Sequence, residues 1–335
     1  MKKFLTFLLL AALTLSLVAC GQSAPNDSNS NAAAGGGSEK GLIVVGFSQV
    51  GAESDWRTAN SQSMKDTFTE ANGYKLIFDD AQGKQDNQIT AIRNFIQQEV
   101  DYIVVAPIGE TGWDTVLQEA KDAGIPVIIV DRMINVAKDD LFYCWVGSDF
   151  RKEGDIAVEW MNKELAGKDA VKIVHLQGTI GSSAQIGRTE GLEAGAKANS
   201  NWEIVAQQTG EFTQAKGQEV MESILKQTTE IDVVYCENDN MAFGAIDAIE
   251  AAGMKAGVGG DIVVISFDAT NAGLTMTLDQ KINYNVECNP LHGPRVAKLI
   301  EQIEAGETPE KLAYVEEEAF DAKTITKEIV DARSY

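Results

Sequence analysis

The residues of this chain best suited to chemistry lie in one short segment, residues 46–57, which reads GFSQVGAESDWR. The segment places an acid, an aromatic ring and a base close together, at Glu53, Trp56 and Arg57. A carboxylate and a guanidinium group make charge-assisted hydrogen bonds, and an aromatic ring covers the C–H face of a small polyhydroxylated molecule. The segment therefore predicts a site for such a ligand, while a helix start with an exposed Trp would account for the same residues.

Similar polar residues follow other segments that have the pattern of buried strands. Asp131 and Arg132 come directly after the apolar run 125–130, and we favour a ligand role for this pair. An Arg beside an Asp at a strand end can hold neighbouring hydroxyl groups from two directions. Any single residue of this kind could instead cap a helix or form a turn, and a cap is the better interpretation of Asp239. The other members of the set are Arg188, Phe212, Asn238, Asp268, Glu287 and Asn289.

These residues need a fold that brings strand ends together, and the sequence predicts one. From Gly41 onward, strand-like and helix-like segments alternate, which is typical of an α/β fold with parallel strands. Parallel strands end at a common edge, where open sheets bind ligands. The predicted strands are residues 42–47, 75–79, 102–106, 125–130, 142–146, 171–176, 203–208, 231–236, 262–267 and 281–286. The predicted helices are residues 55–71, 85–98, 113–123, 151–165, 184–198, 213–226, 239–252 and 292–305.

The alternation forms two series of similar length, with a seam near residues 146–149. Each series is a βαβ array, so we predict two similar Rossmann-like lobes. No internal repeat is strong enough to indicate a duplication. The pattern also leaves open where the chain crosses from one lobe to the other.

Charge and composition exclude several classes of function. The 335 residues include 28 basic and 50 acidic side chains, a formal net charge of −22, which argues against a nucleic-acid partner and against electrostatic binding to a membrane surface. With only two histidines, a site built on imidazole is not expected; we place His175 in the core and His292 at a helix start. GxSxG, HExxH, P-loop and CxxC motifs are absent, so we expect neither an enzyme nor a bound cofactor or metal.

The N-terminus predicts export. Lys2 and Lys3 precede an apolar segment, residues 4–17, and the following LVAC resembles a bacterial lipobox. Residues 1–20 are therefore predicted to be a lipoprotein signal peptide, with Cys20 as the lipidated first residue of the mature chain. Residues 21–40, rich in Ser, Asn, Ala and Gly, are predicted to be a flexible tether. We expect an extracytoplasmic protein, in the periplasm or at the cell surface, anchored to the membrane by lipid.

Several longer motifs resemble the periplasmic sugar-binding proteins of the ribose type, the ligand-capturing subunits of ABC transporters. The resemblance extends from Gly41 to about Val330, and it includes VVAP at 104–107, IIVDR at 128–132, END at 237–239 and SFDAT at 266–270. Within that family the chain is most similar to the galactofuranose-binding members. The shared motifs are GFSQVGAESDWR, ETGW at 110–113, LQGTIGSS at 176–183 and GEFTQAKGQEVME at 210–222.

The resemblance implies a periplasmic binding protein type I fold, in which two lobes joined by a three-segment hinge close on a sugar. It implies a first lobe of residues 41–146 plus about 290–320, and a second lobe of residues 147–289 plus about 321–335. The implied ligand residues of the first lobe are Glu53, Trp56, Arg57, Asp131 and Arg132. Those of the second lobe and hinge are Arg188, Phe212, Asn238, Asp268 and Glu287.

Two positions depart from the ribose-type pattern. Arg57 stands where a second aromatic residue is common in that family, and Glu287 stands where Gln is common. The exchange at Arg57 fits a ligand other than ribose. The implied ligand is a monosaccharide such as galactofuranose or a related furanose or hexose, and the implied partners are the permease subunits of an ABC transporter. A monomer is expected.

Other interpretations remain at this point. A sugar or signal receptor that feeds a chemosensory system would have the same fold, and the sequence does not separate it from a transport protein. A LacI-type regulator would need a basic helix-turn-helix where this chain has an export signal. Three cysteines remain after Cys20, so at most one disulfide forms; Cys144 and Cys288, near the presumed hinge, are the candidate pair. Trp113 is the other tryptophan that could reach a ligand.

Overall fold

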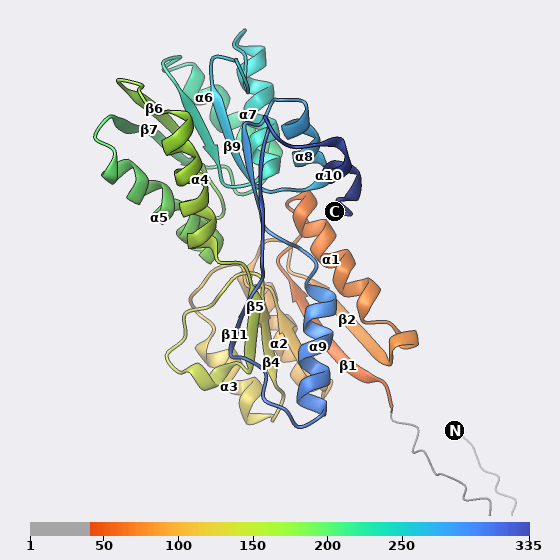
Figure 1. Cartoon of the computed structure of the whole chain (residues 1–335). Helices are drawn as coiled ribbons and strands as arrows, with labels where there is room; N and C mark the ends of the chain where they lie inside the picture. Colours follow the sequence, from red (N-terminus) through yellow and green to blue (C-terminus); the bar gives the residue numbers. More distant parts are fainter. Residues whose placement is uncertain (1–40) are drawn as a thin grey trace, which may run out of the picture. The chain divides into compact units, whose positions relative to one another are not determined.

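Two six-stranded sheets flanked by helices make up residues 41–335, the part of the chain that this computed structural model describes (Figure 1). The predicted signal peptide, the lipidation site Cys20 and the tether lie outside the described residues. No helix within residues 41–335 has the length and apolar character needed to cross a membrane. The predicted α/β class is confirmed, and both sheets are predominantly parallel.

The first sheet has the strand order β11-β5-β4-β3-β1-β2, and all its neighbouring strands are parallel. Its strands are β1 (Ile43–Gln49), β2 (Tyr74–Asp80), β3 (Tyr102–Val105), β4 (Val127–Val130), β5 (Cys144–Gly147) and β11 (Leu312–Tyr314). Strand β4, with the sequence VIIV, shows why such strands are apolar throughout: Ile128 packs with the helices of one face and Ile129 with those of the other. The helices of this sheet are α1 (Asp55–Thr67), α2 (Gln85–Gln97), α3 (Asp114–Asp122) and α9 (His292–Glu304), with short 3₁₀ turns at Glu70–Asn72 and Asp139–Leu141.

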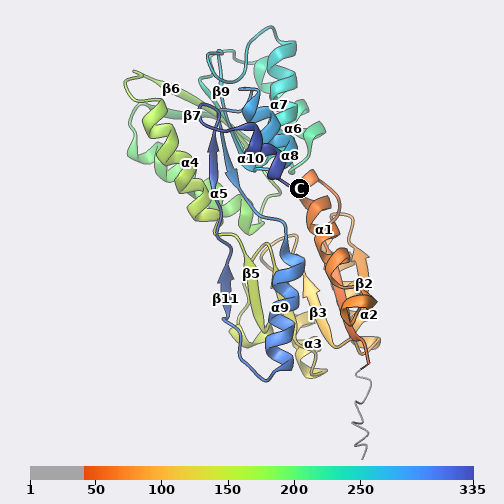
Figure 2. The same cartoon turned by 45° about the vertical axis from the view of Figure 1, so that its right-hand side comes forward.

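The second sheet repeats this plan with the order β12-β10-β9-β8-β6-β7, and only β12 is antiparallel to its neighbour. Helices α4 and α5 pack closely together, and so do α6 and α7 (Figure 2). The strands are β6 (Val171–Gln177), β7 (Trp202–Thr209), β8 (Val233–Cys236), β9 (Val263–Asp268), β10 (Tyr284–Glu287) and β12 (Ala319–Asp321). The helices are α4 (Phe150–Glu164), α5 (Ser183–Ala198), α6 (Gln214–Leu225), α7 (Asp239–Ala251), α8 (Asn271–Leu278) and α10 (Lys327–Ala332).

The chain passes from one sheet to the other at three places: after β5, after β10 and after β11. Helix α9, which follows the second crossing, packs against α1 and β5 of the first sheet. We refer to residues 147–149, 287–291 and 315–318 as the first, second and third crossing segments. The predicted seam near residues 146–149 coincides with the first of them.

The predicted strands and long helices are all present, with ends displaced by a few residues. Two short α-helices and two short strands were missed: α8, α10, β11 and β12. Strands β11 and β12 have three residues each, and α8 reads NAGLTMTL, which carries no clear apolar stripe. Periodicity needs a longer window to be visible, so tertiary pairing rather than local pattern determines these elements.

Candidate functional site

Side chains at the carboxyl ends of strands from both sheets line one cavity, where open parallel sheets place their ligand sites. Every predicted ligand residue except Glu287 lines it. These residues are Glu53, Trp56, Arg57, Asp131, Arg132, Arg188, Phe212, Asn238 and Asp268. The cavity is also lined by four residues that the sequence did not predict as ligand residues: Ser54, Phe150, Ala184 and Cys288.

The start of α1 fixes the aromatic wall of this cavity. Ser54 is the N-cap, and its hydroxyl accepts a hydrogen bond from the backbone N–H of Arg57. Trp56 is 4% exposed, and its indole Nε1 donates to the carbonyl oxygen of Cys288 at 2.6 Å. One turn later, Asn60 donates to the carbonyl oxygen of Pro290. The first turns of α1 are thereby attached to the second crossing segment.

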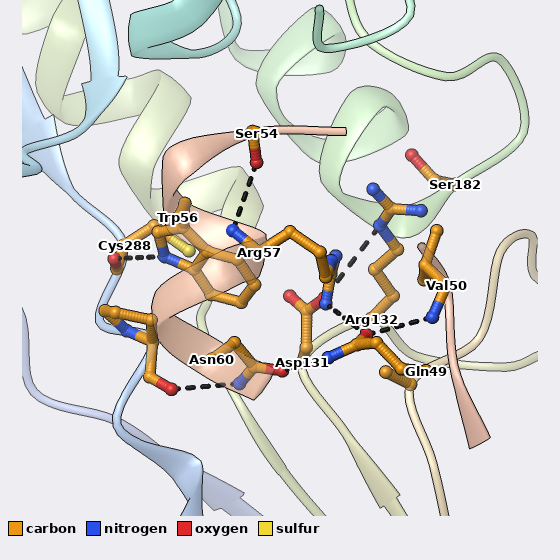
Figure 3. Close-up of polar contacts among 12 residues, drawn as sticks. Gln49, Val50, Ser54, Trp56, Arg57, Asn60, Asp131, Arg132, Ser182 and Cys288 are labelled. Atoms are coloured by element: carbon orange, nitrogen blue, oxygen red, sulfur yellow. Dashed lines mark hydrogen bonds and ion pairs between the residues drawn. The ribbon is translucent and has the colours of Figure 1, made fainter. Parts of the chain in front are cut away.

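Arg57 is held by the protein itself, as Figure 3 shows. Its Nε donates to Glu53 Oε1 at 3.0 Å, and its Nη2 donates to Asp131 Oδ2 at 2.7 Å. Its Nη1 donates to the side chain of Gln49, and the guanidinium lies 4.7 Å from the centre of the Trp56 ring. Burial opposes the charge, but the two carboxylates outweigh burial and raise the pKa of Arg57. Arg57 therefore organises the cavity wall.

Arg132 has weaker ties to its surroundings and keeps donors free for a ligand. Its Nη1 donates to the carbonyl oxygen of Ile108, whereas its Nη2 lies 3.5 Å from Glu53 and its Nε lies 3.9 Å from Asp131. Burial, together with the nearby charge of Arg57, lowers the pKa of Arg132. Glu53 Oε2 is buried without a hydrogen-bond partner among the described residues. This wall therefore has an acceptor, Glu53 Oε2, and donors on Arg132 that are available to a ligand.

The opposite wall carries a second acid–guanidinium pair. Arg188 is 2% exposed, and its Nε donates to Glu153 Oε2 at 2.6 Å. Its Nη2 lies 3.7 Å from Asp268 Oδ1, too far for a hydrogen bond. Burial raises the pKa of Asp268 well above its usual range. Asn238, the N-cap of α7, donates to the carbonyl oxygen of Phe212 and fixes the loop that carries this ring.

Strained backbone conformations gather around the cavity. Asp131, Phe212 and Asp268 have φ angles of 62°, 61° and 104°, in the left-handed region that L-residues rarely adopt. Each such residue costs about 1–3 kcal/mol and persists where the surrounding structure enforces it. At Asp131 and Asp268 the strain falls where a strand ends and a carboxylate must enter the cavity.

Two predicted roles differ in the structure. Glu287 does not line the cavity: its Oε1 accepts hydrogen bonds from Asn289, Arg333 and the Tyr335 hydroxyl. The interpretation of Asp239 as a helix cap is wrong, because Asn238 is the N-cap of α7. The Asp239 carboxylate is fully buried and accepts from Ser266, Thr270 and Asn285, so it joins α7 to the strands beside it.

The remaining candidates are buried, and of these described residues only Cys288 lines the cavity. Trp113 is 1% exposed, and its indole donates to the carbonyl oxygen of Gly109 away from the cavity. His175 is buried as predicted and hydrogen-bonded to Glu237, and His292 begins α9 as predicted. Cys144, Cys236 and Cys288 are free thiols.

Two of the four missed cavity residues follow the same strand-end rule as the predicted ones. Phe150 begins the helix after β5, and Cys288 directly follows β10. Strand-end position could have identified both of them. Ser54 was identifiable as a helix cap, but the packing that brings it to the cavity is a tertiary effect.

Several known proteins resemble this chain in sequence and in overall fold. The periplasmic binding protein domain family matches residues 45–292. The galactofuranose-binding protein YtfQ of Escherichia coli (strain K12) is 40% identical over 291 residues, covering 86% of this chain and 90% of that protein. A crystal structure from Mycobacterium smegmatis in complex with β-D-fucofuranose is 47% identical, with a TM-score of 0.81, covering 84% of this chain and 92% of the other. The binding protein of the arabinose ABC transporter from Shewanella sp. ANA-3, bound to α- and β-L-arabinofuranose, is 41% identical, with a TM-score of 0.82. The match covers 87% of this chain and 95% of the Shewanella chain.

Proposed function

This chain belongs to the periplasmic binding protein domain family, and we propose on this basis that it is the sugar-binding subunit of an ABC transporter. It captures a monosaccharide and delivers it to permease subunits without catalysing a reaction on it. We further propose that it does so as a monomer. The first lobe comprises residues 41–146 with about 290–320, and the second comprises residues 147–289 with about 321–335.

One observation carries this proposal: each wall of the cavity offers an acid and a guanidinium group with unused hydrogen-bonding capacity. Glu53 and Arg132 come from the first sheet's side, and Arg188 and Asp268 come from the second. A hydroxyl group both donates and accepts, so it matches such a pair, and a neutral polyol leaves the charges balanced. Because each wall holds half of the contacts, a sugar stabilises the closed arrangement over an open one.

We propose a furanose as the ligand, because the relatives from Mycobacterium smegmatis and Shewanella bind furanose rings. A thermal-shift screen with D-galactose, D-fucose and L-arabinose, whose solutions contain furanose forms, tests this. A sugar at a hundred times its Kd stabilises the folded state by about 2.7 kcal/mol. D-Glucose, which forms almost no furanose, is the control. A shift with glucose and none with the other three sugars would contradict the furanose class, and no shift with any sugar would contradict the proposed function.

Gly178→Ala is expected to damage the site through Phe212. An added Cβ at Gly178 would lie 1.9 Å from the Phe212 ring, so the ring must leave its place in the cavity wall. We expect sugar affinity to fall at least about tenfold, with a loss of about 1–3 kcal/mol in unfolding free energy from overpacking. Calorimetry and thermal unfolding measure the two effects. Gly41→Ala, which adds a carbon with no atom within 4 Å, is the control, and equal sugar affinity in both variants would refute this role of Phe212.

We also propose that lipid on Cys20 anchors the protein outside the cell membrane. The support is the sequence alone: a charged start, a short apolar segment and LVAC before a polar tether. Cys20→Ser is expected to release the protein from the membrane fraction and to abolish labelling by a radioactive fatty acid. Unchanged fractionation and labelling of this variant would contradict the anchor.

A further inference from the structure

One carboxylate oxygen joins all three crossing segments. Glu317 Oε1, in the third segment, accepts from the Ser148 hydroxyl of the first segment at 2.6 Å. The same oxygen accepts from the backbone N–H of Asn289, in the second segment, at 2.7 Å. The Ser148 hydroxyl also lies 3.3 Å from Cys288 Sγ. Any change in the charge of Glu317 therefore acts at the place where the chain passes between the sheets.

A second buried acid lies beside this junction. Glu153, in the first turn of α4, is 2% exposed, and its Oε2 accepts from Arg188 of the cavity wall. Its Oε1 is buried without a hydrogen-bond partner among the described residues. Ligand atoms of Glu153, Glu317 and Cys288 lie within 4.8 Å of one another. An unpaired buried carboxylate oxygen next to a second carboxylate is unfavourable, so this cluster favours the uptake of a proton or a cation.

The surroundings favour a proton. A metal ion would need the Cys288 thiolate, but burial and the nearby carboxylate of Glu153 raise the pKa of that thiol well above its usual range. Arg188 already supplies one positive charge to Glu153. Burial raises the pKa of Glu153 to about 8 and that of Glu317 to about 7, so one of the two carboxyl groups retains its proton near neutral pH.

We propose that Glu153 and Glu317 share one proton, and that Glu153 is a positioning residue which holds Arg188 for the sugar while this proton is in place. The inference rests on the proposed function. With one proton, the pair carries a single negative charge that Arg188 balances. Loss of the proton leaves two adjacent carboxylates, which repel each other across α4 and the third crossing segment.

Several other titratable groups face the pair from the elements packed around it. These groups are Tyr235 of β8, Asp268 of β9, Asp131 after β4, Cys288 and Glu287 of the second crossing segment, and Arg295 of α9. Burial has the largest effect on the pKa of both carboxyl groups, and Arg188 is the charged group that acts most strongly on each of them.

The expected consequence is sugar affinity that depends on pH. A carboxyl group whose pKa is raised in the folded protein stabilises that state at low pH and loses this contribution as the pH rises through the folded-state pKa. The proposal requires the sugar-bound state to hold the shared proton about one pKa unit more tightly than the sugar-free state, so sugar affinity should fall about tenfold as the pH rises from about 7 to about 9 and the proton is lost. Glu153→Gln keeps a carbonyl for Arg188 and an N–H for Glu317, and it cannot lose that proton.

Calorimetry with D-galactose across this pH range tests the proposal on the full chain. Wild type should lose affinity as the pH rises, Glu153→Gln should lose clearly less, and Glu159→Gln, an exposed acid on the same helix, should follow wild type. The same slope in Glu153→Gln as in wild type would overturn the proposal. A wild-type slope that EDTA abolishes would assign the cluster to a metal ion instead and would also overturn it.

A measurement without sugar keeps this test separate from the proposed function. The ¹³C carboxyl resonances of wild type, assigned through Glu153→Gln and Glu317→Gln, should show at least one of the two acids titrating above about pH 6. If both acids titrate near the ordinary value for Glu, the shared proton is absent whatever the protein binds. If D-galactose gives no heat while the resonances titrate as expected, the sugar assignment fails and the shared proton stands.

Discussion

Replacing Arg132 by Ala is expected to abolish sugar binding while the protein stays folded. Within residues 41–335, the Arg132 guanidinium has one hydrogen bond, to the carbonyl oxygen of Ile108. Burial and the neighbouring charge of Arg57 disfavour its positive charge, as the lowered pKa of Arg132 indicates. Its free donors face the cavity, so a sugar loses two or more charge-assisted hydrogen bonds, each worth about 1.5–3 kcal/mol. Affinity should fall at least about a hundredfold.

Calorimetry and thermal unfolding of the same sample separate the two parts of this prediction. Arg151→Ala removes an exposed guanidinium outside the cavity and should leave both affinity and melting temperature unchanged. Arg132→Lys keeps the charge without the planar fork, and it should restore only part of the affinity. Unchanged affinity in Arg132→Ala would remove this residue from the site.

Arg57→Ala, unlike Arg132→Ala, is expected to cause a large loss in the free energy of unfolding. Three nitrogen atoms of Arg57 are bonded to Glu53, Gln49 and Asp131. Burial alone would raise the pKa of Asp131, but the charges of Arg57 and Arg132 outweigh burial and lower it. Removing the Arg57 guanidinium leaves buried carboxylates without their partner, which costs about 3–5 kcal/mol. Chemical denaturation should show this loss in the unfolding free energy.

The matched control is Arg93→Ala, which breaks an ion pair with Glu119 in which the side chains are 48% and 39% exposed. Such surface pairs contribute about 0–1 kcal/mol, so this variant should unfold close to wild type. If Arg57→Ala proved as stable as Arg93→Ala, the organising role of Arg57 would be refuted.

The sequence predicted the lobes and most of the cavity because both follow from local pattern. Apolar runs such as 125–130 identify buried parallel strands, and the residue after such a run must lie at the ligand edge of the sheet. Asp131 and Asp268 were found in this way. Glu53, Trp56 and Arg57 were found because three chemically suited residues occur within five positions.

The rest depends on contacts between distant segments, which no local pattern contains. Glu287 ends a strand as predicted, but the C-terminal residues Arg333 and Tyr335 occupy its carboxylate. The sequence suggested that Arg57 would bind hydroxyl groups. In the structure it donates to Gln49 and Glu53 of its own segment and to Asp131, which lies 74 residues further along the chain and is brought near only by the fold. The junction at Glu317 likewise needs all three crossing segments in place.

A crystal structure of the protein grown with D-galactose tests the central claim most directly. We predict a furanose ring in the cavity, with hydroxyl groups within hydrogen-bonding distance of Arg132 and Glu53 on one side and of Arg188 and Asp268 on the other. Trp56 should lie against the ring. A sugar bound elsewhere on the protein, or a cavity in which these side chains point away from the bound ring, would contradict the account.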